Sequence, residues 1–200
     1  MIVLCIILGY LLGSVSVSIL ISKYFFHDDV RGHGSGNAGA TNVARVFGLQ
    51  AGFLTFLGDC LKSVLAMWLG ALLAGDTGLA LAGAACLIGH CFPVFFRFRG
   101  GKAVSAGAAV GLMLDWRLFL ISIAVFLIVA FLFKIASVAS MSAAIAQAAG
   151  AFLFTNSLLL ILLAIFAAIL VVFMHRSNIR RLIAGQEPKF HAAGRKEKDS

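Results

Sequence analysis

The amino-acid sequence predicts an all-α integral membrane protein: a bundle of about seven transmembrane helices that forms one domain, residues 1–200, with no soluble part. Three observations support this fold class. The 200 residues are 62% hydrophobic and 12% charged, whereas soluble domains are roughly half apolar and a quarter charged. The chain holds only two prolines, which suits long helices. The mean hydropathy is +1.04, and most charges lie in short segments between apolar stretches, as in loops between membrane spans.

Seven apolar segments are candidates for these helices, since a membrane span needs about 20 apolar residues. They are residues 2–22, 49–74, 78–96, 103–114, 118–133, 137–153 and 157–174. The first has no basic start and no clear cleavage site of a signal peptide, so it is expected to be retained. The fourth is short and is expected to be tilted, half-buried or re-entrant. The sixth is rich in alanine and serine, which predicts an internal helix.

The loops between the segments fall into two sets that differ in charge. One set holds nearly all the lysine and arginine: residues 23–48, 97–102, the surroundings of Lys134, and 175–200. The other set is short and carries only Asp76, Asp115 and Arg117: residues 75–77, 115–117 and 154–156. The positive-inside rule places basic loops in the cytoplasm. With seven spans, the N-terminus is expected outside and the C-terminus in the cytoplasm, with residues 190–200 as a flexible tail.

The composition argues against several other functions. A net charge of +8 is compatible with nucleic-acid binding, but the basic residues flank membrane segments, so no nucleic-acid partner is expected. The four cysteines form no CxxC pair. No cluster of histidine, cysteine or carboxylate residues has the spacing of metal ligands, so neither a metal nor a cofactor is expected.

Residues 33–45 form the first of three polar islands and are suited to bind an anion. Gly34-Ser-Gly-Asn-Ala-Gly39 matches the dinucleotide pattern GxGxxG, but no βαβ unit surrounds it, which argues against such a site. Glycines still allow backbone N–H groups to converge on an anion. The island adds polar side chains: Ser35, Asn37, Thr41, Asn42 and Arg45. The alternative is an ordinary glycine-rich loop.

The second and third islands offer cations near helix ends. Gly100-Gly101-Lys102 resembles the end of a Walker A loop but lacks its other required residues. It predicts a turn that opens a helix, where Lys102 and free N–H groups attract phosphate. His175, Asn178 and Arg181 share a face if the last helix continues through them. For both islands the alternative is a set of basic membrane anchors.

Three further polar residues lie within apolar segments. Asp59 and Lys62 are three residues apart, so they lie on one helix face and can pair. Charged groups in a membrane helix face the bundle interior, where this pair is either structural or supports the site. His90 is either a buried, hydrogen-bonded histidine or part of the site.

Together these islands resemble the bacterial acyl-phosphate:glycerol-3-phosphate acyltransferase (PlsY) family. The resemblance is carried by residues 34–45, 89–93, 100–105 and 175–187, and by Asp59-Cys-Leu-Lys62. Four positions depart from the family pattern: Ala103 stands where glycine is usual, Ser105 where alanine is usual, Ala106 where threonine is usual, and Met174 where arginine is common.

The resemblance implies transfer of a fatty acyl group from acyl-phosphate to the 1-hydroxyl of sn-glycerol 3-phosphate. The products would be 1-acyl-glycerol 3-phosphate (lysophosphatidate) and inorganic phosphate, as the first acylation step of bacterial phospholipid synthesis. The implied location is the bacterial plasma membrane, with the active site facing the cytoplasm. A soluble enzyme that makes acyl-phosphate is a further candidate partner. The rival interpretation is a multi-span transporter for a phosphorylated solute.

The resemblance also implies roles for individual residues. Glycerol 3-phosphate is expected to contact Ser35, Arg45, Lys102, His175 and Asn178. Acyl-phosphate is expected to contact Gly34, Ser35, Gly36, Asn37, Thr41 and Asn42. Supporting positions are Asp59, Lys62, His90, Arg181 and Glu187. Catalysis is expected from Ser35, Lys102, His175 and Asn178. Either His175 or a substrate phosphate acts as the general base.

Overall fold

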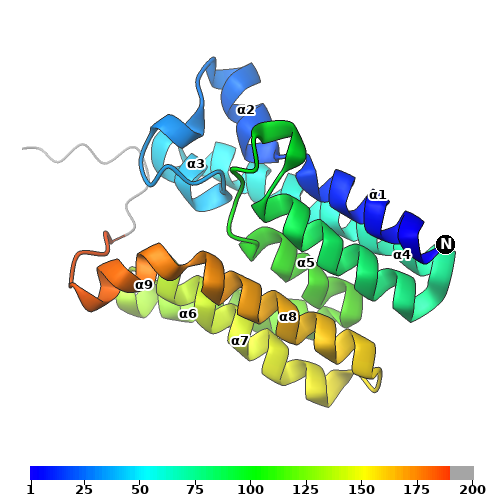
Figure 1. Cartoon of the computed structure of the whole chain (residues 1–200). Helices are drawn as coiled ribbons and strands as arrows, with labels where there is room; N and C mark the ends of the chain where they lie inside the picture. The colour runs from blue at the N-terminus through cyan, green and yellow to red at the C-terminus, as the bar shows by residue number, and fades with distance from the viewer. Residues whose placement is uncertain (190–200) are drawn as a thin grey trace, which may run out of the picture.

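Long apolar helices that run side by side make up most of the molecule (Figure 1). The structure is a computed structural model that describes residues 1–189, so the predicted flexible tail, residues 190–200, lies outside the described residues. The helices are α1 (Ile2–Ser14), α2 (Val17–Phe26), α3 (Ala40–Phe47), α4 (Leu49–Cys91), α5 (Val104–Leu114), α6 (Trp116–Phe133), α7 (Ala136–Phe154), α8 (Leu158–Met174) and α9 (Arg176–Ile183). Two 3-10 turns, η1 (Val30–Gly32) and η2 (Val94–Phe96), lie between them.

The all-helical membrane fold is confirmed, but fewer helices than the predicted seven meet the length of a full span. Among the described residues, four stretches are long and apolar enough to cross a membrane: Ile2–Phe26, Leu49–Phe96, Trp116–Phe133 and Ala136–Phe154. A fifth is added if α8 and α9, which are bent by 55°, form one span. The chain therefore has four to five apolar spans by length and composition.

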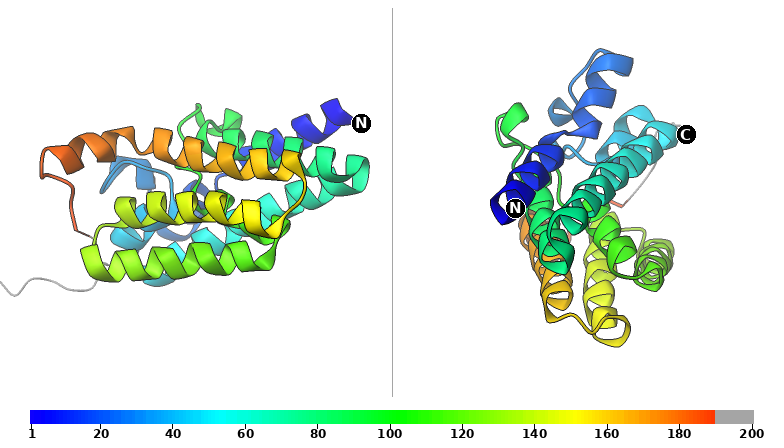
Figure 2. Two further views of the ribbon diagram at one scale, coloured as in Figure 1. Left: turned by 90° about the horizontal axis from the view of Figure 1, so that it is seen from below. Right: turned by 90° about the vertical axis from the view of Figure 1, so that its right-hand side faces the viewer.

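Two elements account for the difference from seven. α5, the predicted fourth segment, has 11 residues, which at a rise of 1.5 Å per residue reach about 16 Å, roughly half the thickness of the hydrocarbon core. α4 joins the predicted second and third segments into one element. Its backbone leaves the helical region at Ala74 and Gly75, where the chain turns back (Figures 1 and 2).

The N-terminal region also differs from the prediction. Residues 2–22 form two helices, because Val15 and Ser16 adopt an extended conformation. α2 then turns away from the bundle (Figure 1). The carbonyl groups of Gly13 and Val15 at this break accept hydrogen bonds from Lys62 Nζ, at 3.0 and 2.5 Å. The buried Lys62 ammonium thus provides hydrogen bonds to carbonyl groups that have no partner within the interrupted helix.

Residues 23–48, predicted as a loop, contain the end of α2, η1 and α3. The apolar residues of α3 recur at the spacing of an amphipathic helix, i, i+3, i+4 and i+7: Ala40, Val43, Ala44 and Phe47. That periodicity was present in the sequence and was overlooked. Three of the predicted anion-binding side chains therefore lie on a helix: Thr41, Asn42 and Arg45.

Small residues bring the helices close together. A Cβ atom at Gly9 or Gly13 of α1 would overlap the backbone of α4 at Ala82 or Cys86. α7, predicted to be internal, contacts α5, α6 and α8. Most of its buried residues are alanine or serine. Close approach through small side chains is the usual way in which membrane helices pack.

The polar segments gather at one end of the bundle (Figures 1 and 2). This end holds the loop from Gly34 to Gly39, the connection before α5, the α6–α7 loop and α9. The opposite end holds the N-terminus, the bend of α4 and the α7–α8 loop. The structure therefore brings the three polar islands together, as the charge pattern predicted.

Candidate active site

A cavity of about 670 Å³ lies at the polar end and extends between the helices. Its outer part is lined by residues from all three islands, including Arg45, Lys102 and His175. The rest of its lining is mainly apolar and comes largely from α4, α6 and α8: Phe53, Phe56, Ile123, Phe126, Leu127, Ala167 and Val171. Phe53 and Leu127 are exposed on the surface of the molecule. The cavity thus joins a cationic mouth to an apolar part.

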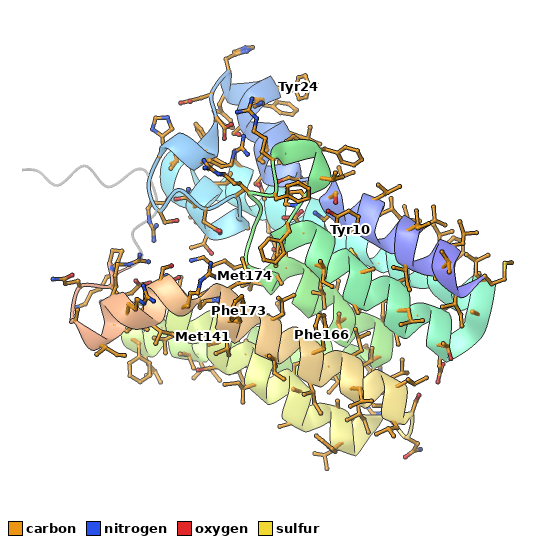
Figure 3. All side chains as sticks on the ribbon, viewed as in Figure 1. Tyr10, Tyr24, Met141, Phe166, Phe173 and Met174 are labelled. Carbon is orange, nitrogen blue, oxygen red and sulfur yellow. The ribbon has the colours of Figure 1, made fainter. Side chains whose placement is uncertain are left out.

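A smaller cavity of about 240 Å³ adjoins this mouth. The two cavities share four lining residues: Ser35, Asn37, Lys102 and Arg181. The smaller one adds Gly36, Met174, Arg176 and Ser177. Figure 3 shows Met174 at the end of α8 that faces the nitrogen-bearing side chains of the mouth. The polar surface is therefore continuous from one cavity to the other.

The glycine-rich loop is shaped by its own residues and by Asn42. Gly34 and Gly36 have φ of 58° and 70°, a region that glycine enters without strain. Asn42 Oδ1 accepts a hydrogen bond from the Ser35 N–H at 2.9 Å. Its Nδ2 donates to the carbonyls of Val30 and His33 at 3.1 and 3.0 Å. Asn42, predicted to contact acyl-phosphate, thus fixes the loop, while the Ser35 side chain lines both cavities.

Lys102 lies just before α5, as predicted, and its ammonium donates a hydrogen bond to Asn178 Oδ1. Burial, followed by the positive charge of Arg181, lowers the pKa of Lys102 to about 8. The charges of Arg45 and Arg176 also lower it, whereas the carboxylate of Glu187 raises it. The mouth therefore concentrates positive charge that an anion would stabilise.

His175 lies at the bend between α8 and α9. The chain is helical again from Arg176 to Ile183, but α9 is bent by 55° from α8, so the last helix does not continue straight through residues 175–181. The His175 side chain is 4% exposed. Nδ1 lies 2.7 Å from the Val171 carbonyl oxygen, and a carbonyl only accepts, so Nδ1 carries the hydrogen. In the neutral ring Nε2 then keeps its lone pair, which orients His175 as a proton acceptor in the cavity wall.

Glu187 connects the third island to α7. Its Oε1 accepts hydrogen bonds from Asn178 Nδ2 at 2.6 Å and Ser137 Oγ at 2.7 Å, and its Oε2 accepts from Arg181 Nε at 2.7 Å. Burial opposes ionisation, but these bonds lower the pKa of Glu187 overall. The Asn178 amide is thereby oriented with its oxygen toward Lys102.

The predicted Asp59–Lys62 pair is confirmed, and His90 joins it. Lys62 Nζ lies 2.8 Å from Asp59 Oδ1 and 3.2 Å from His90 Nδ1. Within the described residues neither Asp59 oxygen receives a well-directed hydrogen bond, so the carboxylate is neutralised mainly by the charge of Lys62. His90 is 5% exposed and also lines the large cavity. It is therefore both a buried, partnered histidine and part of the wall of the candidate site.

The other predicted site residues are placed as follows. The large cavity is lined by Ser35, Asn37, Thr41, Asn42, Arg45, His90, Lys102, His175, Asn178, Arg181 and Glu187. Gly36 lines only the smaller cavity, and Gly34, Asp59 and Lys62 line neither. Sequence analysis did not identify Ser137, Lys134 or Gln147 as lining residues. A single glutamine in an apolar helix and a lysine in a basic loop were the available signals.

Residues 1–189 contain no group of three or more histidine, cysteine, aspartate or glutamate residues placed to hold a metal ion. The cations of the mouth can stabilise negative charge there. They come from three separate elements: Arg45 from α3, Lys102 from the connection before α5, and Arg181 from α9.

Comparisons with known proteins agree on one family. The family model described as glycerol-3-phosphate acyltransferase matches residues 3–185. The glycerol-3-phosphate acyltransferase of Bacillus subtilis (strain 168) is 41% identical over 189 residues, 94% of this chain and 97% of the relative. That of Thermoanaerobacter sp. (strain X514) is 40% identical over 187 residues, 94% of each chain.

Solved structures agree with these relatives. The crystal structure of PlsY (YgiH), an integral membrane glycerol 3-phosphate acyltransferase, matches in its glycerol 3-phosphate form with a TM-score of 0.89 and 34% identity. The match covers 95% of this chain and 96% of that chain. The lysophosphatidic acid form of PlsY matches with a TM-score of 0.87 and 33% identity, over 95% of each chain.

Proposed function

Because the chain belongs to the glycerol-3-phosphate acyltransferase family, we propose that it transfers a fatty acyl group from acyl-phosphate to the 1-hydroxyl of sn-glycerol 3-phosphate. The products are 1-acyl-glycerol 3-phosphate and inorganic phosphate. The observation that carries this proposal is the cavity that joins a cationic mouth to an apolar part. Both substrates bring phosphate to the mouth, and the acyl tail fits the apolar part.

The charges of the mouth support two phosphate-bearing substrates. Arg45, Lys102, Arg176 and Arg181 surround it, and Glu187 is its carboxylate, already paired with Arg181. An arginine binds phosphate through two parallel hydrogen bonds. Buried cations gain more from such an anion than exposed ones do. This concentration of cations at one end does not favour the rival transporter, whose site would lie near the middle of the membrane.

Acyl transfer requires a new ester bond and loss of phosphate. The 1-hydroxyl oxygen attacks the acyl carbon, and the bond from that carbon to the phosphate oxygen breaks with its electron pair on phosphate. Arg45 and Lys102 stabilise the charge that develops on this leaving group. The proton of the hydroxyl passes to His175 Nε2 or to the leaving phosphate. No metal or cofactor takes part in this scheme.

Transfer is proposed to be direct, without an acyl-enzyme. A serine nucleophile needs a neighbouring base, and among the described contacts the Ser35 hydroxyl makes no hydrogen bond to a histidine or a carboxylate. An acyl-phosphate is already activated, so positioning the two substrates contributes much of the rate.

The polar end is proposed to face the cytoplasm of a bacterial plasma membrane. Support comes from the basic loops, which all lie at this end of the bundle (Figures 1 and 2). Counted as runs of the chain between the two ends of the bundle, α1 with α2, the two halves of α4, the short α5, and α6 to α8 give seven. An odd number places the N-terminus outside.

The choice of acyl donor distinguishes the proposed acyl-phosphate reaction from transfer out of a thioester. Purified protein is incubated with labelled glycerol 3-phosphate and either palmitoyl-phosphate or palmitoyl-CoA, with and without a chelator. We expect labelled lysophosphatidate from the phosphate donor alone, undiminished by the chelator. Equal turnover with the CoA donor, or loss with chelator that added metal restores, would overturn the proposal.

A further inference from the structure

His90 lies where the two anion-binding segments meet. Gly101 immediately precedes Lys102, and Ala38 belongs to the glycine-rich loop. A Cβ atom at Gly101 would overlap His90 Nε2 and would lie 2.9 Å from the carbonyl oxygen of Ala38. The imidazole edge, the segment that carries Lys102 and the glycine-rich loop are therefore packed without room for one methyl group.

Backbone hydrogen bonds also attach the Lys102 segment to the end of α4. The N–H of Gly101 donates to the carbonyl of His90 at 3.0 Å, and the N–H of Gly100 donates to that of Cys91 at 3.1 Å. A Cβ atom at Gly100 would overlap the His90 carbonyl oxygen. The position of Lys102 is thus set by the residue pair His90 and Cys91.

The imidazole is held from its other side by the buried ion pair. Lys62 contacts His90 Nδ1 at 3.2 Å, and because an ammonium only donates, Nδ1 accepts and Nε2 carries the ring hydrogen. Asp59 balances the charge of Lys62. Ion pairs buried this deeply contribute little net stability, so fixing the imidazole gives this pair a role beyond stability.

We propose that His90 is a positioning residue for Lys102: the Asp59–Lys62 pair fixes its ring, and the ring edge fixes the Gly100–Gly101 segment against the glycine-rich loop. This inference rests on the proposed function, because Lys102 acts there as a phosphate-binding group. Loss of the ring edge frees the segment, displaces the Lys102 ammonium relative to Arg45 and weakens phosphate binding.

The test is a double-mutant cycle between positions 90 and 101. His90→Asn keeps an acceptor for Lys62, since its Oδ1 replaces Nδ1, and removes the ring edge. We expect the KM for glycerol 3-phosphate to rise about 10-fold, with a smaller change in kcat. Gly101→Ala should lower kcat/KM strongly in the wild-type background and less in the His90→Asn background, because the overlap with Nε2 is gone and only the 2.9 Å contact with the Ala38 carbonyl oxygen remains.

The positioning role would be overturned if the fall in kcat/KM of the double variant equalled the product of the falls in the two single variants. An unchanged KM in His90→Asn would also overturn it. Arg117→Ala at the opposite end is the control for expression and activity. His90→Gln is the second variant, and failure of both His90 variants to fold would also overturn the inference, because the role would then be structural. A wild-type protein that does not acylate glycerol 3-phosphate contradicts the proposed function instead.

Discussion

We expect anion binding to depend most on two residues, Arg45 and Lys102. They come from different islands, and both line the mouth of the large cavity. Each of these cations can make more than one charge-assisted hydrogen bond to phosphate. Each such bond contributes about 1.5–3 kcal/mol, and a total of about 2.7 kcal/mol already corresponds to about 10²-fold in rate. We therefore expect Arg45→Ala and Lys102→Ala each to lower kcat/KM by at least ~10²-fold, measured on folded, purified protein.

The control for these variants is Arg117→Ala. Arg117 is exposed, lies in the first turn of α6 and pairs at 2.7 Å with Asp115, the residue that caps this helix; it lines neither cavity. Its replacement should leave kcat/KM nearly unchanged. A similar loss in all three variants would indicate a general folding defect and contradict the assignment.

The lowered pKa of Lys102 predicts a pH dependence. With its pKa near 8, caused first by burial, the free enzyme loses the ammonium charge as pH rises through this value. Phosphate binding needs the charged form, so kcat/KM for glycerol 3-phosphate should fall above about pH 8. In Lys102→Arg the guanidinium stays charged, so the fall should move to higher pH. An alkaline limb that does not move would show that another group titrates.

At the residue scale, the sequence predicted which side chains meet but not what each one binds. Asn42 and Ser35 belong to one anion-binding motif, yet the Asn42 amide is occupied by the loop backbone. A sequence motif gives the donors and acceptors but not which groups they hydrogen-bond to, because the hydrogen-bond partners depend on the geometry of the turn. His90 likewise allowed two interpretations, and only the position of Gly101 beside its ring connects it to the site.

At the element scale, the hydrophobic pattern predicted the helices well and their bends poorly. Residues 103–114 and 118–133 correspond closely to α5 and α6. The turn at Ala74 and Gly75 and the bend at His175 arise from local backbone conformations. Such bends involve the backbone of only one or two residues, so they hardly alter the periodic spacing of apolar residues in the sequence. α3 was missed because it is short and lies between the apolar segments.

The close packing of α1 on α4 gives an element-scale prediction. Gly13→Ala would place a methyl group into the backbone of Cys86 and should destabilise the protein by about 1–3 kcal/mol. Gly107→Ala in α5 is the matched control, because its nearest neighbour would be a Val171 methyl group at 3.8 Å. There alanine should be neutral or slightly stabilising. Equal melting temperatures for both variants would contradict the packing.

At the scale of the whole molecule, the distribution of charge was the most informative signal. It predicted that residues 33–45, 97–102 and 175–181 meet, and their side chains line one cavity. The apolar part of that cavity could not be predicted in this way. Phe53, Phe126 and Ala167 are ordinary residues of apolar helices, and only their packing leaves a space between them.

Membrane sidedness gives a whole-molecule prediction. Single cysteines at positions 36 and 186, introduced into a background without the four native cysteines, should react with a membrane-impermeant reagent only after the cytoplasmic face is exposed. A cysteine at position 2 should react from outside. Labelling of positions 36 and 186 from opposite faces would contradict both the pass count and the shared mouth.

The central claim is that one cavity holds both substrates and passes the acyl group directly between them. The intact mass of the purified enzyme after incubation with palmitoyl-phosphate alone tests it most directly. The account predicts an unmodified mass, followed by lysophosphatidate when glycerol 3-phosphate is added. A stoichiometric acyl adduct that disappears in Ser35→Ala or in a cysteine variant would contradict direct transfer.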